Sequence, residues 1–388
     1  MHICVVAPDY PTSKTIDFVF VDQLCRAMAL KGVTVSVVAP QTLTKCVMRH
    51  VPVVKGKQRI YVSNDKYFTL IRPKYWSVGN VKGFLKGHNG KAFRKAVKRG
   101  FSKVDGKVDV IYGHFWQSVS AAMLVAQKHH IPLIASSGEE LVEKSRFGNT
   151  DELIHALRES INGSIHVSTN NRNECLAVGV TTQEKSIVIP NAIDNQLFYP
   201  RDKKECRRKL GVNDEDFVVG YVGQFTPRKG TLRLNEALKR LEDKNIKAFF
   251  LGKGSDVPDY EGIIHCGTVM HDLLPEYLSA ADVFVLPTQN EGCCNAIIEA
   301  LACGLPVISS NLPFNWDVLD KSNSIMVDPN RVDEIAEAIK RLKESVNLQK
   351  ELSKGALKKA KSLTLDQRVE KIIGFISQKI NDKKYNNE

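Results

Sequence analysis

The sequence lacks the patterns of a secreted, membrane-spanning or zinc-binding protein. Its nine cysteines are an odd number and form no C-x-x-C pair, which favours reduced cysteines over a disulfide framework or a zinc site. No apolar run approaches the roughly 18 to 20 residues that a spanning helix needs. The chain opens directly on an apolar strand at residues 2–7, without the regions of a signal peptide. We therefore expect a cytoplasmic location.

Two further absences concern bound groups. Residues 2–38 have the pattern of a strand, a helix and a second strand, yet the G-x-G-x-x-G fingerprint is missing, so no dinucleotide is expected there. No His/Cys cluster offers metal ligands. The sequence therefore predicts neither a metal ion nor another cofactor.

Acidic residues are scarce in one stretch of the chain. The segment from Arg49 to Lys107 holds sixteen Lys and Arg residues against Asp65 and Asp105, so it carries more net positive charge than the +12 of the whole chain. Such asymmetry indicates an anionic partner, which could be nucleic acid, a membrane surface or a phosphorylated substrate.

One helix is predicted within this basic segment, at residues 91–104. Its apolar residues fall on one face, and the remaining face carries Lys91, Arg94, Lys95, Lys98 and Arg99. Two interpretations are close to equal. The helix either docks on its own domain with a solvated basic face, or it lies at an anionic lipid surface.

The length of 388 residues fits two domains. Apolar strand runs alternate with amphipathic helices from end to end, which is typical of the α/β class. Residues 190–194 end the first domain and begin a linker, and a second α/β unit starts at residue 217. Strands are expected at residues 2–7, 34–38, 108–112, 131–136, 164–168, 186–189, 217–222, 248–251, 263–265, 283–286 and 307–310.

The most informative stretch is residues 283–302. The apolar run at 283–287 predicts a buried parallel strand, and residues 295–302 predict a helix. Glu291 lies in the intervening loop and Glu299 about two turns into the helix. Free amides at the helix start suit an anion, and carboxylates suit a vicinal diol such as a ribose or a hexose. The alternative is that Glu291 complements the helix start and Glu299 is a solvated residue, but a carboxylate between buried strands is costly without a partner.

Two other loops carry candidate residues. Arg228 and Lys229 lie between a strand end and a helix start, with glycines on both sides, where they can bind phosphate. The alternative is that they are two exposed loop cations. His114 follows the strand at 108–112, and strand ends are where ligands of open α/β sheets bind. A single histidine is otherwise more often structural.

Three motifs together resemble the retaining family-4 glycosyltransferases of GT-B fold. Residues 190–194, followed by Phe198 and Pro200, resemble the linker motif P-N-G-V-D…F-P. Residues 222–230 resemble V-G-R…K-G. Residues 291–308 resemble the paired-glutamate signature of that family. The resemblance implies two Rossmann-like domains facing across a cleft: an acceptor domain at 1–194, a donor domain at 195–364, and a C-terminal helix and tail at 365–388 that packs back toward the first domain.

The resemblance also implies roles by position. Lys229 would hold the donor diphosphate, Glu299 the ribose, and Glu291 the transferred sugar, with His114 near that sugar. Further donor-binding positions are implied for these residues: Gly223, Arg228, Thr268, Val269, Gly292, Cys293, Cys294 and Asn295. The family arginine after Gly223 is Gln224 here, and we infer that Arg228 supplies its charge. The glycine pair of the family's first loop is absent from residues 9–14.

These observations predict a retaining, metal-independent glycosyltransferase that uses a nucleoside diphosphate sugar, a UDP- or GDP-sugar, and a glycan or lipid-linked glycan acceptor in surface polysaccharide biosynthesis. The basic segment 49–107 would attach it peripherally to an anionic membrane on the cytoplasmic side, and no nucleic acid is expected. The alternatives are a non-catalytic protein that binds an anionic polymer and a sugar-phosphate synthase of the same fold.

Overall fold

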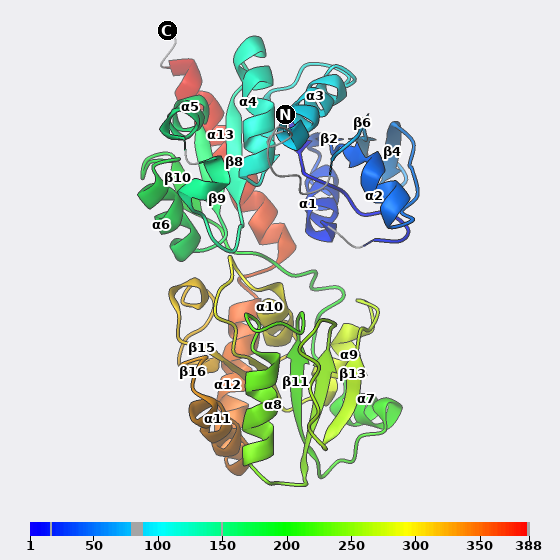
Figure 1. The fold of residues 1–388 in the computed structure, drawn as a ribbon, viewed down its shortest axis with the longest axis vertical. Helices are drawn as coiled ribbons and strands as arrows, with labels where there is room; N and C mark the ends of the chain where they lie inside the picture. Colours follow the sequence, from blue (N-terminus) through cyan, green and yellow to red (C-terminus); the bar gives the residue numbers. More distant parts are fainter. Residues whose placement is uncertain (16–17, 79–87, 149, 386–388) are drawn as a thin grey trace. The chain divides into compact units, whose positions relative to one another are not determined.

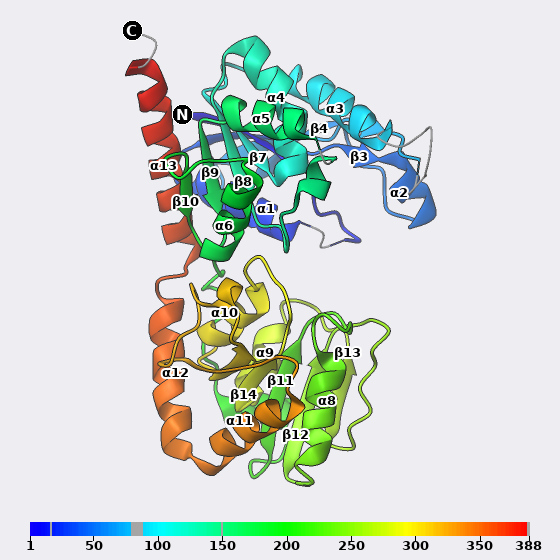
Figure 2. The same cartoon turned by 60° about the vertical axis from the view of Figure 1, so that its left-hand side comes forward.

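The computed structural model describes residues 1–15, 18–78, 88–148 and 150–385, which fold into two compact α/β units (Figures 1 and 2). Unit 1 contains Met1–Val167, Asn171–Ile189 and Val369–Glu388, and unit 2 contains Ser168–Asn170 and Pro190–Arg368. The chain thus leaves unit 1 at Pro190, the first residue of the predicted linker motif at 190–194, and returns to unit 1 at Val369. The last helix is shared, with most of its length in unit 1.

Unit 1 is built on an eight-stranded sheet. Its strands are parallel except for the edge strand β4, which pairs antiparallel with β5. In spatial order the strands are β10 (Ser186–Val188), β9 (Gly163–His166), β8 (Leu133–Ser137), β7 (Val110–His114), β1 (His2–Val6), β2 (Thr34–Val38), β5 (Tyr67–Ile71) and β4 (Lys57–Tyr61). A separate two-residue pair joins β3 (Gln41–Thr42) to β6 (Lys74–Tyr75).

The order of these strands reverses between β1 and β7. From β1 the chain passes through α1 (Val19–Leu30) to β2, whereas from β7 it passes through α4 (Trp116–His129) to β8 on the other side. Because such connections are right-handed, α1 and α4 cover opposite faces of the sheet. The apolar central strands are buried accordingly, as the residues of β1 and β7 all are.

The remaining helices around this sheet complete its two layers. They are α2 (Leu43–Met48), α3 (His88–Phe101), α5 (Asp151–Ser160), α6 (Thr169–Val178) and α13 (Leu365–Tyr385). The terminal helix α13 packs closely on β9, since a Cβ on Gly163 would lie 2.8 Å from the ring of Phe375. Figure 2 shows α13 running along this unit as the red helix.

The burial of α3 decides how the apolar face of this basic helix is covered. Phe93 and Val97 on α3 belong to the core cluster of unit 1 and Ala96 between them is buried, so the apolar face is docked on its own domain and cannot insert into lipid. The aromatic residues of the segment are divided as well: Phe68 and Phe93 are buried, while Tyr61 and Trp76 are exposed. Lys82, Phe84 and Lys86 lie outside the described residues.

Unit 2 is built on a six-stranded parallel sheet. In spatial order its strands are β13 (Ile263–Gly267), β12 (Ile246–Leu251), β11 (Phe217–Val222), β14 (Val283–Leu286), β15 (Val307–Ser310) and β16 (Ser324–Val327). Its helices are α7 (Lys203–Leu210), α8 (Thr231–Arg240), α9 (Leu274–Ala280), α10 (Asn295–Ala302), α11 (Val332–Glu344) and α12 (Val346–Ala360). The strand order reverses between β11 and β14, because α8 leads from β11 to β12 and α10 leads from β14 to β15.

Element boundaries differ from the sequence prediction by a few residues. The helix expected at 91–104 is α3, which begins at His88 and ends at Phe101. His114, expected in a loop, is the last residue of β7. The first helix begins at Val19, and Asp17, its expected start, lies outside the described residues. Apart from the antiparallel edge strand β4, both sheets are parallel and Rossmann-like, as the pattern predicted.

Candidate active site

The reversal point of the unit 2 sheet gathers most of the predicted residues. In open α/β sheets, ligands bind at the carboxyl ends of the strands where the strand order reverses. In unit 2 these ends belong to β11 and β14, which continue into the loops at 223–230 and 287–294. The first loop carries Arg228 and Lys229 and the second carries Glu291, so the fold brings together residues that lie more than sixty positions apart.

The two loops are joined at their backbones. The N–H of Gln289 donates to the carbonyl of Arg228 at 2.9 Å. Gly230 adopts φ 77° beside the carbonyl oxygen of Pro287, which would lie 2.4 Å from any Cβ at this position. Only glycine fits there, because a side chain would meet both a strained backbone and a backbone atom. The helix α8 therefore starts at a fixed position against the second loop.

Glu291 lies at the centre of the cluster, with a side chain only 9% exposed. Its Oε1 accepts hydrogen bonds from Arg228 Nη1 at 3.1 Å, from Thr288 Oγ1 at 3.0 Å and from Lys229 Nζ. Arg228 Nη1 also donates to the carbonyl of Asn290 at 2.7 Å. Two cations thus share one carboxylate in the ligand-free protein, which offsets the cost of burying their charges.

The protonation of this cluster follows from its contacts. Burial opposes the charge of Lys229, but the thiolate that Cys294 forms only at high pH and the carboxylate of Glu291 favour it, and together they raise the pKa of Lys229. Burial raises the pKa of Cys293 to about 12 and that of Cys294 to about 11. Both thiols are therefore neutral near pH 7, which excludes them as thiolate nucleophiles.

The start of α10 is left free for an anion. Cys294 precedes the helix in an extended conformation and its side chain makes no capping hydrogen bond. The first backbone N–H groups of a helix have no partner within the helix, and the dipole favours negative charge at this end. The predicted residues Gly292, Cys293 and Asn295 flank this position, where Asn191 Nδ2 from the linker donates to the Cys293 carbonyl at 3.0 Å.

Glu299 faces a histidine that the sequence analysis did not single out. His271 Nε2 lies 3.3 Å from Glu299 Oε1, and the imidazole also packs edge-on against Phe198 at a centroid distance of 5.3 Å. The hydrogen bond to Glu299 raises the pKa of His271 against the opposing effect of burial. No motif indicated this pair, because His271 lies in the loop after β13 and meets Glu299 only through the fold.

The remaining predicted donor-binding residues of unit 2 make fewer contacts. Thr268 and Val269 directly follow β13, the edge strand of the sheet. Gly223 follows β11, and the side chain of Gln224 is exposed, while its carbonyl accepts from Tyr221 Oη at 2.9 Å. The guanidinium beside Glu291 is that of Arg228.

His114 lies in unit 1, at the carboxyl end of β7. Its ring is buried and packs against Phe20 and Phe115 at centroid distances of 5.2 and 4.6 Å. Phe115 adopts φ 67° and ψ 150°, a conformation that costs other residues than glycine about 1 to 3 kcal/mol. Such strain is concentrated at functional sites, and here it falls at the turn that follows His114.

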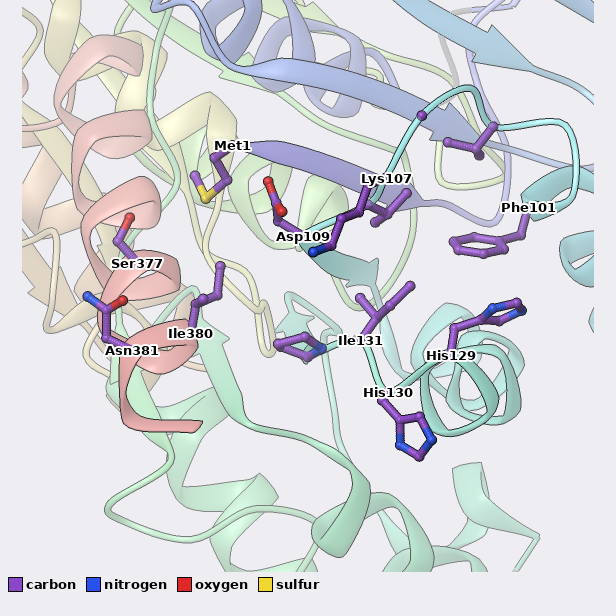
Figure 3. Close-up of a pocket in the computed structure, with 14 residues that line it drawn as sticks. Met1, Phe101, Lys107, Asp109, His129, His130, Ile131, Ser377, Ile380 and Asn381 are labelled. Carbon is purple, nitrogen blue, oxygen red and sulfur yellow. The ribbon is translucent and has the colours of Figure 1, made fainter. Parts of the chain in front are cut away.

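A hollow of about 730 Å³ lies at the opposite edge of the unit 1 sheet (Figure 3). It is bordered by the amino ends of β1 and β7, by the last turns of α3 and α4, and by Ser377, Ile380 and Asn381 on α13. Helix C-termini carry partial negative charge, which basic residues such as Lys128 and His129 in the last turn of α4 complement. The basic residues at the end of α4 are thus explained by the helix that they complement. This amino edge of the sheet is also not the carboxyl edge where ligands of such sheets bind.

Within the described part of the chain, no group of three or more His, Cys, Asp or Glu residues could hold a metal ion. No helix among the described residues has both the length and the apolarity needed to cross a membrane.

Comparison with known proteins identifies the class of this chain. The family Glycosyl transferases group 1 matches residues 202–359. Over 358 residues the chain is 27% identical to TuaC of Bacillus subtilis, which is named as a teichuronic acid biosynthesis glycosyltransferase, covering 88% of this chain and 89% of that protein. It is 25% identical over 392 residues to a D-inositol 3-phosphate glycosyltransferase of Stackebrandtia nassauensis, covering 92% and 85%.

Solved structures share the fold across nearly the whole chain. A sucrose-phosphate synthase from Thermosynechococcus elongatus superposes with a TM-score of 0.76 at 20% identity, covering 97% of this chain and 98% of the other. Anabaena HepE, solved in complex with UDP-glucose, superposes with a TM-score of 0.71 at 18% identity, covering 97% and 100%. The two units therefore have the GT-B fold of these structures. Residues 202–359, which make up most of unit 2, carry a Glycosyl transferases group 1 domain.

Proposed function

We propose that this glycosyltransferase transfers a sugar from a nucleoside diphosphate donor, a UDP- or GDP-sugar, to a hydroxyl of a glycan or lipid-linked glycan, with retention of the anomeric configuration. The observation that carries this proposal is the cluster in which Glu291 binds both Lys229 and Arg228 beside the uncapped start of α10. Two cations and free amides suit a diphosphate, and carboxylates suit the hydroxyls of sugar rings.

Each donor group has a matching partner in this cluster. Lys229 and Arg228 bind the diphosphate together with the amides of α10, and Glu299 accepts from the ribose hydroxyls. Glu291 accepts from hydroxyls of the transferred sugar. Because the donor needs the cations and the carboxylate separately, its binding breaks the ion pairs that Glu291 makes in the free protein. Thr268 and Val269 present main chain to the base.

The chemical step exchanges one bond for another at the anomeric carbon. The bond from this carbon to the phosphate oxygen breaks and a bond to the acceptor hydroxyl oxygen forms on the same face. The departing diphosphate takes the proton of the acceptor hydroxyl. Lys229, Arg228 and the α10 amides stabilise the charge that develops on the leaving phosphate, so no metal ion is required. His114 lies near the transferred sugar.

The name of one relative supports a role in polysaccharide biosynthesis, whereas two other names point to a phosphorylated acceptor. TuaC is named for teichuronic acid biosynthesis, and the relatives from Stackebrandtia and Thermomonospora are named for transfer to D-inositol 3-phosphate. We infer a role in surface polysaccharide biosynthesis from the first of these, because its chain and this one cover each other almost completely.

A panel of nucleotide-sugars tests the proposed donor. We expect one nucleoside diphosphate sugar to raise the melting temperature of the protein more than its nucleoside monophosphate does. A protein that no nucleotide-sugar stabilises would contradict the proposal. With the donor identified, NMR of the coupling product reports the anomeric configuration, and an inverted product would exclude the retaining mechanism. Fructose 6-phosphate as an acceptor tests the alternative of a sugar-phosphate synthase.

Attachment to an anionic membrane is the second part of the proposal. The apolar surface suited to it lies on α2 and the neighbouring segment, where Val47, Met48 and Trp76 are 65%, 75% and 62% exposed. The Thr44 hydroxyl donates to the Ser77 carbonyl at 2.6 Å, which holds these segments together. Exposed apolar residues beside basic ones are typical of proteins that bind at lipid headgroups.

The charge for this contact comes from the exposed basic face of α3. Lys95, Lys98 and Arg99 are exposed, and Arg99 Nη2 donates to the Lys74 carbonyl at 2.7 Å. The helix therefore lies beside the segment that carries Trp76. Each basic residue near an anionic bilayer contributes on the order of 1 kcal/mol, so α3 supplies electrostatic attraction while α2 and Trp76 supply the apolar contact.

Vesicle sedimentation tests the membrane proposal. We expect salt-sensitive binding to anionic vesicles and none to neutral ones. Two variants separate the contributions: Lys95→Gln/Lys98→Gln/Arg99→Gln should lose the electrostatic part, and Met48→Ser/Trp76→Ser should lose the apolar part. Both should keep the donor affinity of the wild type. Equal binding by all three proteins, or binding by none, would contradict a membrane role.

A further inference from the structure

The carboxyl edge of the unit 2 sheet continues beyond the Glu291 cluster. That cluster lies where β11 and β14 end, whereas a separate hollow of about 620 Å³ lies further along the edge, at the ends of β15 and β16. Its volume is within the range of roughly 300 to 1,000 Å³ that is usual for small-molecule sites. Gln289, two residues before Glu291 on the same loop, borders this outer hollow.

The outer hollow combines apolar and polar side chains. Leu312 and Met326 contribute half-buried apolar surface, and Gln289, Asn311 and Asp328 contribute exposed polar groups. Asn311 directly follows β15 and Asp328 directly follows β16, and the Asn311 N–H donates to the last carbonyl of β16 at 2.8 Å. The sheet therefore places these two polar residues side by side, at the edge where ligands of such sheets bind.

Hydrogen bonds among the bordering residues hold the polar groups in place. Gln289 Nε2 donates to Asn330 Oδ1 at 2.7 Å, and the Asn330 N–H donates to Asp328 Oδ1 at 2.9 Å. The Asp328 N–H in turn donates to Glu334 Oε2 at 2.9 Å. Within the described ranges of the chain, no hydrogen bond is made by Gln289 Oε1, Asp328 Oδ2 or Asn311 Nδ2. A ligand therefore meets two acceptors and one donor on side chains that are already oriented.

An exposed tryptophan is tied to the border of the outer hollow. Trp316 is 57% exposed, and its Nε1 donates to Asn311 Oδ1 at 3.1 Å. Single exposed apolar side chains are common on proteins, but this indole is held beside polar groups that a ligand can reach. A flat aromatic face next to hydrogen-bonding side chains suits a sugar ring, which has apolar C–H groups on its faces and hydroxyl groups around its edge.

The charge of the outer hollow disfavours anions. Asp328 and Glu334 border it, whereas no Lys or Arg does so among the described residues. The guanidinium of the neighbouring Arg331 is paired with Asp333 at 2.9 Å and with Glu334 at 3.4 Å. The diphosphate of the donor is therefore suited to the cluster around Lys229 and not to this hollow. An uncharged ligand that is rich in hydroxyl groups matches the donors, acceptors and aromatic face found here.

We propose that the outer hollow binds an uncharged stretch of the glycan chain, with one sugar ring packed on Trp316 and its hydroxyl groups bound by Gln289, Asn311 and Asp328. The inference rests on the proposed function, which supplies the glycan. The hollow holds sugar residues other than the one that reacts, because no described side chain of the Glu291 cluster borders it. A chain that is held at two places binds more tightly than one held at a single place, so long glycans are favoured over short ones.

Titrations with neutral oligosaccharides test this assignment, with the donor site first saturated by the nucleoside diphosphate that the panel selects. Maltohexaose, cellohexaose and mannohexaose are the probes, each compared with its disaccharide. We expect at least one hexaose to bind the wild type, more tightly than its disaccharide does, and to bind Trp316→Ala about tenfold more weakly. The control Trp76→Ala removes an indole of similar exposure, 62%, from unit 1 and should bind the hexaose as the wild type does. All three proteins should bind the nucleoside diphosphate alike.

An anionic probe tests the preference for an uncharged ligand. Hexagalacturonate should bind the wild type more weakly than the neutral hexaose does, because it meets the carboxylates of the hollow. Asp328→Asn removes one negative charge and keeps a side-chain oxygen that can accept from the Asn330 N–H. This variant should therefore narrow the difference between the two probes without a lower melting temperature. Tighter binding of hexagalacturonate than of every neutral hexaose by the wild type would overturn the proposed ligand class.

Other results would also overturn the inference. Unchanged hexaose binding by Trp316→Ala, or an equal loss in Trp76→Ala, would mean that the outer hollow is not where the glycan binds. Equal affinity for a hexaose and its disaccharide would mean that no extended chain is held. If none of the three hexaoses binds to a wild type that binds the nucleotide, the inference fails while the proposed function stays intact. A wild type that binds no nucleotide would instead contradict the proposed function.

Discussion

The reversal points of the two sheets handle charge in opposite ways. In unit 2, Lys229 and Arg228 are paired with the buried carboxylate of Glu291. In unit 1, Lys91 and Arg94 have no such partner among the described residues, and Glu139 is bound by amides and a hydroxyl instead. A ligand of unit 2 must therefore break existing ion pairs, whereas Lys91 and Arg94 make none with the residues that the structure describes. Binding of an anion at the α3 cations should accordingly be more sensitive to salt than binding at the buried cluster of unit 2.

The largest effect should come from removing the internal counterion of unit 2. Glu291→Gln frees Lys229 and Arg228 but removes the acceptor for the transferred sugar. We expect turnover to fall by about 10- to 150-fold, the cost of a lost charged hydrogen bond, while the affinity for the nucleoside diphosphate product stays equal or increases. Steady-state kinetics and calorimetry on the same preparation check this. A parallel loss of both quantities would mean that Glu291 holds the diphosphate site together rather than the sugar.

A smaller loss is expected where the sequence departs from the family pattern. Arg228→Ala should weaken donor binding and turnover more than an ordinary loop substitution does, because its guanidinium lies 3.1 Å from Glu291 Oε1. The comparison that decides its role is Gln224→Arg in the Arg228→Ala background. Recovered turnover would assign Arg228 the charge of the missing family arginine. If turnover does not recover, the two positions are not equivalent.

Acidity should change the stability of unit 2 only slightly, through His271 and Glu299. The hydrogen bond to Glu299 raises the pKa of His271 above the ordinary value of a histidine, about 6.5, so the pair stabilises the folded protein below that value and loses its contribution as pH rises through the raised pKa. Since the imidazole is 36% exposed, we expect only about 0.2 to 1 kcal/mol.

Urea unfolding of the wild type and His271→Gln at about pH 5.5 and pH 8.5 measures this contribution. The stability difference between the two proteins should shrink at the higher pH. In a Glu299→Gln background it should be absent at both values. A difference that grows with pH would reverse the sign and contradict the pairing.

Removal of metal ions should have the smallest effect of all. If Lys229, Arg228 and the α10 amides carry the phosphate charge, EDTA leaves initial rates unchanged. Loss of activity that Mg²⁺ or Mn²⁺ restores would show that the cluster in unit 2 needs a metal ion beside its own cations.

The sequence allowed much of unit 2 and less of unit 1 to be predicted. The strand at 283–286 and the helix at 295–302 have the predicted boundaries, because buried parallel strands are continuous apolar runs and the loop between them carries a motif. The joining of Glu291 to Lys229 across two loops could be expected, since both follow strands that the fold places side by side. His271 could not, because its contact with Glu299 depends on tertiary structure alone.

In unit 1, periodicity identified the helix but not what its two faces meet. The pattern of α3 left docking and lipid insertion equally open, and only the burial of Phe93 and Val97 decides for docking. The turn at Phe115, directly after His114, has a positive φ that no propensity predicts in a phenylalanine. Sites that carry a motif can be found from the sequence, whereas sites that depend on a strained turn need the coordinates.

The most direct test of the central claim compares nucleoside mono- and diphosphates in calorimetric titrations of the wild type, Lys229→Ala and Glu299→Gln. If unit 2 binds the donor as proposed, the wild type prefers the diphosphate, and Lys229→Ala loses most of that preference because it lacks a phosphate charge. Glu299→Gln should weaken both nucleotides alike, by about 1.5 to 3 kcal/mol, because both share the ribose. Unchanged affinities in both variants would contradict the assignment of the donor site to the carboxyl edge of unit 2.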